Sequence, residues 1–242
     1  MKPATRISTS QRPFVFVNMA MTADGKIATA NRAVHAFGSA RDLRHVYELR
    51  AGADAILCGA RTVEISQAVL DNGGEKFTQQ RRTEGRAEYN LRVIVSGSGS
   101  VDPGAALFKN KFSPIIVLTT KRAAAKNLVR LRAVADEVKI CGEREINFHA
   151  TLRWLRTKWG VKRLLCEGGG ELNEALFRAD LVDEIHLTIC PKIFGGGTAP
   201  TIAEGTGFRR LKDAQAFQLS SIRSFYGELF TVFSRLDSGR DE

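Results

Sequence analysis

A strand, three glycines and a helix follow one another within Val161–Phe177, and this order constrains the fold more than any other stretch of the chain. Val161–Cys166 is a short apolar run of the length that buried strands have. Gly168-Gly169-Gly170 interrupts the run, and apolar residues then recur at helical spacing, at Leu172, Ala175, Leu176 and Ala179. We therefore predict a strand that turns directly into a helix beginning near Glu171.

Three successive glycines give this turn properties that suit an anionic ligand. Without Cβ atoms, the backbone adopts positive φ and leaves its N–H groups accessible. The helix that follows directs the positive end of its dipole toward the same place, which favours a phosphate or a pyrophosphate. Glu167 lies at the carboxyl end of the strand, where open α/β sheets bind their ligands. The alternative is a tight turn without a ligand, with Glu167 as a solvated carboxylate.

Strands and helices alternate along the chain, which predicts an α/β fold with a mixed, mostly parallel central sheet. The predicted strands are 14–19, 53–58, 91–95, 114–120, 137–141, 161–166 and 181–190, followed by a hairpin of 216–222 and 225–236 around Ser224. The strands from Glu184 onward should be antiparallel and lie at an edge. Asp71–Asn90 is polar and highly charged, and we expect a long loop there. We expect one domain over residues 13–236, with polar tails at 1–12 and 237–242.

The formal net charge of +10 raises the question of nucleic-acid binding. However, the Lys and Arg residues are spread along the chain, and no aromatic stacking motif accompanies them. An excess of positive charge also suits small anionic ligands, so we expect phosphorylated ligands rather than nucleic acid.

The four cysteines and four histidines show neither CxxC spacing nor metal-ligand spacing. We therefore predict buried thiols and no metal site. No apolar run approaches about 18 residues, and the first residues lack an apolar signal core. We expect a cytoplasmic protein that does not contact membranes.

Four blocks of sequence resemble the riboflavin-biosynthesis pyrimidine reductases, which belong to the dihydrofolate-reductase-like superfamily. They are MTADGKIA (Met21–Ala28), RAGADAILCGARTV (Arg50–Val63), LLCEGGGELNEALFRADLVDEIHL (Leu164–Leu187) and PKIFGGGTAPT (Pro191–Thr201). The resemblance implies a dihydrofolate-reductase-like three-layer α/β/α fold, a homodimer, and NADPH as cofactor. It also implies that the ribosylamino group of a phosphorylated pyrimidine is reduced to a ribitylamino group, the cofactor supplying the hydride.

The resemblance further implies roles for individual residues. Asn18, Arg50 and Glu167 match substrate positions, and Asn18 and Glu167 are the catalytic candidates. Asn18 also resembles the archaeal and fungal branch, which acts on the 2,5-diamino pyrimidinone. The cofactor positions are Ala20, Thr62, Ser66, Leu70, Gly168, Gly169, Gly170, Glu171, Leu172 and Asn173.

Each of these residues also has a structural interpretation. Arg50 could be a basic residue favoured by the dipole at the end of a helix. Thr62 could cap the start of a helix, and Asn18 could be a strand-end residue that bonds to its own backbone.

Hydroxyl and basic side chains after two predicted strands are candidates for the adenosine 2′-phosphate of the cofactor. They are Ser96, Ser98, Thr120, Lys121 and Arg122. They pair neutral donors with positive charge at strand ends, the combination that an anion such as a phosphate needs.

The chain departs from the family pattern after Val63. Ser66 stands where the family has aspartate, and the family's substrate-side arginine is absent near Val69–Gly73. Either the long loop supplies the charge, through Lys76, Arg81, Arg82 or Arg86, or the substrate lacks that phosphate. This leaves two alternatives to a pyrimidine reductase. One is a reductase of the same fold for a pterin or another small imine or carbonyl compound, and the other is a non-enzymatic binder of nucleotides or nucleic acid.

Overall fold

The structure is a computed structural model that describes residues 11–32 and 37–236. The chain forms two compact units, each assembled from separate segments. The first unit comprises Met1–Phe14 and Tyr47–Glu167, and the second comprises Val15–Val46 and Gly168–Glu242. Most of the predicted polar tails, residues 1–10 and 237–242, lie outside the described residues. One domain over 13–236 therefore stays a prediction.

The first unit is built on five parallel strands in the order β5-β4-β3-β2-β6. Their bounds are Ala55–Gly59 for β2, Leu91–Val95 for β3, Ile115–Thr119 for β4, Glu137–Ile140 for β5 and Arg163–Cys166 for β6. All five occur where the sequence predicts a strand. The inner strands, such as β2 and β4, are apolar without alternation because both faces of the sheet are covered there, whereas the edge strand β5 is only partly buried.

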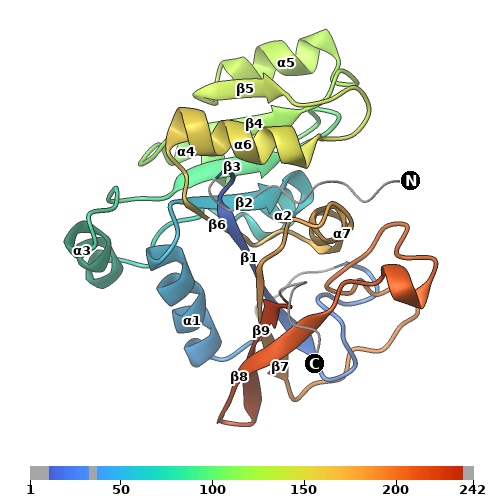
Figure 1. Cartoon of the computed structure of the whole chain (residues 1–242). Helices are drawn as coiled ribbons and strands as arrows, with labels where there is room; N and C mark the ends of the chain where they lie inside the picture. The colour runs from blue at the N-terminus through green and yellow to red at the C-terminus, as the bar shows by residue number, and fades with distance from the viewer. Residues whose placement is uncertain (1–10, 33–36, 237–242) are drawn as a thin grey trace. The chain divides into compact units, whose positions relative to one another are not determined.

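Helices cover both faces of this sheet. On one face, Ile56 and Ile94 of the sheet pack with side chains of α2 (Ala60–Ser66), α4 (Ala106–Lys109) and α5 (Ala125–Arg132). Side chains that point the other way, such as Leu57 and Val93, are fully buried as well. Figure 1 shows α6 (Phe148–Trp159) running in front of β4, and α6 buries Leu152 and Leu155. The expected α/β class and mostly parallel pairing are confirmed.

The predicted long loop at Asp71–Asn90 is wrong in part, because it contains the helix α3 (Glu75–Thr83). Phe77, Thr78 and Arg81 form the buried face of this helix. The sequence shows no clear signal for the helix because two of these three buried residues are polar or charged.

The second unit contains β1 (Phe14–Thr22), β7 (Glu184–Cys190), β9 (Glu228–Arg235) and β8 (Phe217–Phe225), adjacent in that order. β7 pairs parallel with β1 and antiparallel with β9, so only the final hairpin is antiparallel throughout. The hairpin turns at Tyr226-Gly227 rather than around Ser224, because these two residues have φ of 49° and 82°. Two positive φ values are what tight hairpin turns require.

Two helices complete the second unit. α7 (Gly170–Arg178) follows the glycines as predicted and buries Leu172 and Leu176. α1 (Ala40–Ala51) begins after Ser39, whose hydroxyl accepts hydrogen bonds from the backbone N–H groups of Arg41 and Asp42. The part of α1 in this unit packs on β7, because the His45 ring lies 5.7 Å from the His186 ring. In the sequence, Ile185, Leu187 and Ile189 alternate with polar residues, which predicts a half-exposed strand. This prediction is wrong, because the polar Thr188 is only 1% exposed.

Candidate active site

Arg50 and Glu167 form a bidentate ion pair in the first unit. Arg50 is in the last turn of α1, and Glu167 directly follows β6. The Arg50 Nε and Nη2 groups each donate to one carboxylate oxygen of Glu167, both at 2.7 Å. The side chains are only 10% and 13% exposed. The sequence predicted a substrate role for both residues, and the structure brings their charged groups together at the carboxyl end of the parallel sheet.

The surroundings of the pair keep Arg50 charged. Burial alone would lower the pKa of Arg50, but the charge and hydrogen bonds of Glu167 raise it, and Asp71 adds to the effect. The remaining Nη1 group donates to the Asp71 carbonyl at 2.7 Å. A charged guanidinium that engages both oxygens of a carboxylate holds that carboxylate rigidly, with further lone pairs left to accept hydrogen bonds from a ligand.

Tyr47 forms an aromatic wall beside the pair. Its ring centroid lies 5.5 Å from the Arg50 guanidinium and 5.8 Å from the Phe77 ring. Gly73 packs against the ring so closely that a Cβ there would lie 2.2 Å from the Tyr47 Cγ atom. Burial and the negative charge of Asp71 raise the pKa of the Tyr47 hydroxyl, so it is protonated at neutral pH.

The arginines of Glu75–Arg86 are engaged elsewhere in the first unit. Arg81 is fully buried, and its Nη1 donates to the backbone carbonyls of Arg50, Ala51 and Ala53. Burial lowers the pKa of Arg81 to about 10, and the charge of Arg86 adds to this. Arg81 therefore fixes the end of the helix that carries Arg50, and it is not positioned to bind a ligand itself.

Two other arginines of this segment form ion pairs at the surface. Arg82 pairs with Glu75 and Glu88, and Arg86 pairs with Asp54 and Glu84. Lys76 is exposed, with its amino group 5.9 Å from the Phe77 ring centroid. Among the loop residues named as replacements for the family's arginine, Lys76 is thus the exposed one without a described carboxylate partner.

Gly169 and Gly170 of the second unit each require glycine, for different structural reasons. Gly169 has φ of 112°, which other residues rarely adopt, and no side chain of the described residues caps α7 there. Gly170 is small because the Thr201–Glu204 segment packs onto it: a Cβ would lie 2.6 Å from the Thr201 carbonyl oxygen and 2.3 Å from Glu204 Cγ. Gly168 immediately precedes them.

The first turn of α7 is fixed by the same segment. Asn173 is fully buried and donates through Nδ2 to the Ile202 carbonyl, and Leu172 is 7% exposed. Glu171 is exposed in the first turn. Asn173 and Leu172 therefore hold the helix start in place, and the amino end of α7 carries the positive end of the helix dipole, which favours a phosphate.

Asn18 lies inside β1 and is 7% exposed. Within the described residues its Oδ1 atom has no hydrogen-bond partner, so the alternative of a strand-end residue bonded to its own backbone is excluded. A buried carboxamide without a partner is costly unless a ligand or water completes its hydrogen bonds. Ala20, two residues along the strand, faces the same side and is partly exposed.

The candidate phosphate residues meet at the carboxyl ends of β3 and β4. The Thr120 hydroxyl donates to the Gly97 carbonyl, and a Cβ on Gly97 would lie 3.3 Å from the Arg122 guanidinium. Ser98 donates to Ser100, both on the exposed surface of this loop. Arg122 is exposed above a glycine, so its guanidinium can reach a ligand that lies on the loop.

Two of the predicted residues at this sheet end have other partners. Ser96 is 4% exposed, and its hydroxyl accepts a hydrogen bond from the Val101 backbone N–H. Lys121 pairs with Glu143 at 2.7 Å in an exposed ion pair. Ser96 therefore shapes the loop, while the Lys121 charge is shared with a carboxylate.

The residues predicted around α2 have mixed environments. Thr62 is in the first turn of α2 and is partly exposed. The exposed Ser66 donates its hydroxyl to the Thr62 carbonyl. Leu70 is 2% exposed, has φ of 58° and belongs to the core cluster on β2 and β3. Its side chain packs the core rather than facing a ligand.

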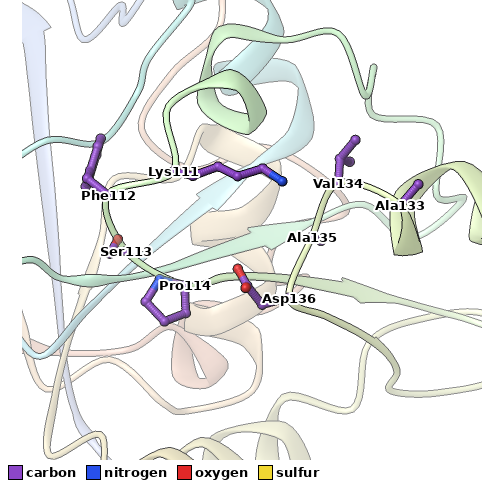
Figure 2. Close-up of a pocket in the computed structure, with 8 residues that line it drawn as sticks. All are labelled: Lys111, Phe112, Ser113, Pro114, Ala133, Val134, Ala135 and Asp136. Carbon is purple, nitrogen blue, oxygen red and sulfur yellow. The ribbon is translucent and has the colours of Figure 1, made fainter.

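A cavity of about 340 Å³ lies at the opposite edge of the sheet (Figure 2). It is lined by residues 111–114 and 133–136, which precede β4 and β5. Figure 2 shows Lys111 extending across the opening toward Val134. Ligands of parallel sheets bind at the carboxyl ends of the strands, so this cavity is separate from the candidate site.

The cysteines and the possible metal ligands limit the chemistry that the site can perform, and the helices bear on membrane contact. The four cysteines are buried, as predicted, and within the described residues they form no disulfide. Over residues 11–32 and 37–236, no group of three or more His, Cys, Asp or Glu side chains is placed to hold a metal ion. In the same part of the chain, every helix is too short or too polar to span a membrane.

Known proteins resemble the chain over nearly its whole length. It is 34% identical over 226 residues to the 2,5-diamino-6-ribosylamino-4(3H)-pyrimidinone 5′-phosphate reductase of Archaeoglobus fulgidus, covering 93% of this chain and 99% of the relative. The solved pyrimidine reductase-like protein of Corynebacterium diphtheriae is 22% identical, with a TM-score of 0.79 and coverage of 98% and 97%. RibD of Acinetobacter baumannii is 17% identical with a TM-score of 0.72, and the chain spans 59% of its length.

These similarities define the class of the protein: it is a reductase of the riboflavin-biosynthesis type, as the sequence predicted. Residues 13–225 match the model of the RibD C-terminal domain. The chain belongs to the RibD C-terminal domain family. A reductase of this kind implies a nicotinamide cofactor, and the glycine-rich amino end of α7 fits a phosphate of such a group.

Proposed function

We propose that the chain is an NADPH-dependent reductase that converts 2,5-diamino-6-ribosylamino-4(3H)-pyrimidinone 5′-phosphate to its ribitylamino product. The relative from Archaeoglobus fulgidus bears the name of this activity. The observation that carries the proposal is the buried Arg50–Glu167 pair at the carboxyl end of the parallel sheet. We further propose that the protein is a cytoplasmic homodimer of single-domain chains.

In this proposal, residues of the chain bind and orient rather than exchange protons. Glu167, held by Arg50, accepts hydrogen bonds from the polar groups of the substrate, and the Asn18 carboxamide supplies a further contact. The cofactor, when bound, supplies the hydride. Gly168–Asn173 hold its pyrophosphate, and Arg122 and Lys121 select its 2′-phosphate. Ala20, Thr62 and Ser66 complete the cofactor contacts.

The test is an assay of NADPH oxidation with two substrates, the diamino pyrimidine and its deaminated form. We expect oxidation with the diamino compound and a product heavier by two hydrogen atoms in mass spectrometry. Faster oxidation with the deaminated compound would assign the chain to the other branch of the family. Absence of oxidation with both compounds would contradict the proposal.

A second candidate is a reductase of the same fold that acts on another substrate, such as a pterin. It is favoured by the fixed positions of Arg81, Arg82 and Arg86, which are engaged away from a substrate phosphate. A panel of pterins and small imines in the same assay distinguishes it. A non-enzymatic binder of nucleic acid would instead bind polynucleotides in a strongly salt-dependent way and oxidise no NADPH.

A further inference from the structure

The unpaired carboxamide of Asn18 has a polar neighbour on the next strand. In the parallel pairing of β1 with β7, Asn18 is the register partner of His186. Register partners of adjacent strands point to the same face of the sheet. The Phe16 and His186 rings, 5.9 Å apart in an edge contact, support this placement, because Phe16 shares a face with Asn18.

His186 is itself held at one end only. Its Nε2 atom lies 2.6 Å from the Oε1 atom of Glu184 on the same strand. A carboxylate accepts hydrogen bonds, so this contact favours the tautomer with the proton on Nε2, in which the Nδ1 atom is an acceptor. Nδ1 is buried and, among the residues that the structure describes, has no hydrogen-bond partner.

Side chains of α1 and β9 pack around the His186 ring. His45 of α1 lies 5.7 Å from the His186 ring and 5.6 Å from the Phe230 ring of β9. Val232 is the register partner of His186 on β9, and Arg41 of α1 lies over Phe230. A buried acceptor in such surroundings is costly unless it finds a donor, and the amide of Asn18 is on the adjacent strand.

The two unpaired groups are chemically complementary. A carboxamide has a donor end and an acceptor end, and half a turn about its Cβ–Cγ bond exchanges them without changing its shape. With the Asn18 N–H₂ group donating to His186 Nδ1, the Asn18 oxygen is turned outward. That oxygen then accepts from an N–H or O–H group of a ligand.

We propose that His186, fixed by Glu184, is a positioning residue that binds the amide end of Asn18 and turns its oxygen toward the substrate. Part of this inference rests on the proposed function, because the substrate is the group that Asn18 then meets. The contact between the two side chains is a property of the free protein. It is therefore tested separately from activity.

Nitrogen-15 NMR of the free protein tests the contact. We expect the Nε2–H tautomer at His186, and side-chain N–H₂ signals of Asn18 that shift in H186Q. The matched control is H149Q, which changes another partly buried histidine on α6 and should leave the Asn18 signals in place. Asn18 signals that respond equally to both substitutions, or an Nδ1–H tautomer at His186, would overturn the proposal.

Two substitutions of His186 separate positioning from a structural role. Asparagine places its amide where Nδ1 was, facing Asn18, whereas glutamine places its amide where Nε2 was, facing Glu184. We expect H186N to keep kcat/KM within about twofold and H186Q to lower it about tenfold, the size of one lost hydrogen bond. Equal losses in the two variants would show that the histidine only fills space.

A double-mutant cycle with N18A shows whether the histidine acts through Asn18. In the N18A background, H186Q should cause no further loss of kcat/KM. Losses that multiply would mean that His186 acts independently, which contradicts the inference. If the wild-type protein oxidises no NADPH with any pyrimidine, the proposed function fails, while the NMR result still decides whether His186 holds Asn18.

Discussion

Replacing Glu167 with glutamine should destabilise the fold as well as slow the reaction. The amide of glutamine keeps one oxygen for Arg50 but presents an N–H₂ group to the second Arg50 donor. One hydrogen bond is therefore lost, and the acceptor of the other no longer carries a negative charge. A hydrogen bond to a charged group contributes roughly 1.5–3 kcal/mol, and breaking a buried ion pair costs roughly 3–5 kcal/mol. Because the Asp71 carbonyl still accepts from Arg50, we expect a loss near the lower end, about 3 kcal/mol.

Urea denaturation measures this loss directly. With a slope of about 3 kcal/mol per molar urea, the midpoint should fall by about 1 M. The matched control is E75Q, the same substitution in the exposed pair of Glu75 with Arg82, which should leave the midpoint in place. The double variant R50M/E167L should recover most of the stability, because it leaves no buried charge unpaired.

Activity gives a second measurement on the same variants. E167Q should lower turnover about a hundredfold, since orientation of the substrate is lost, while affinity for NADPH changes little. An E167Q protein that unfolds at the wild-type urea concentration and turns over normally would refute the reasoning, because the pair would then neither stabilise the site nor orient the substrate.

Four further predictions concern the remaining features. G73A should lose more stability than G74A, by about 1–3 kcal/mol, because both have positive φ but only Gly73 packs against the Tyr47 ring; equal thermal melts would contradict this. R81M should lower the unfolding free energy by about 3 kcal/mol, since the carbonyls at the end of α1 lose their donor, and R82M, with its exposed side chain, is the control in the same denaturation assay. R122A should reduce the preference for NADPH over NADH, measured as the ratio of kcat/KM values, and an unchanged ratio would remove the assigned role. The four cysteines should react with a thiol reagent only after unfolding, because burial raises the pKa of Cys58, Cys141 and Cys190; rapid labelling of the native protein would exclude this.

The sequence predicted the parallel strands and the glycine turn because their patterns are local. A continuous apolar run and a change to helical spacing are visible without any tertiary information. The start of α1 also has a local cause, because the short polar side chain of Ser39 bonds to backbone within three residues.

The sequence could not predict features that depend on distant segments. Arg81 reads as a surface charge, and only the carbonyls of residues 50, 51 and 53 make it a buried donor. His186 reads as the polar side of a half-exposed strand, and the covering helix shows otherwise. The hairpin turn was misplaced because Tyr226, unlike asparagine or glycine, gives no local signal of positive φ.

The candidate site was predicted in its residues but not in its contacts. Arg50 and Glu167 are 117 positions apart, so nothing local in the sequence joins them. The missing arginine near Val69–Gly73 was visible in the sequence, but only the structure excludes Arg81 as its replacement. Whether Lys76 supplies that charge stays a prediction.

The tight packing of the Thr201–Glu204 segment on Gly170 affects how mutagenesis of this region is read. An alanine there would displace that segment before any nucleotide arrives, so a drop in turnover would not identify Gly170 as a ligand contact. In mutational scans of glycine-rich turns, a loss of activity caused by disturbed packing can therefore be mistaken for the loss of a ligand contact.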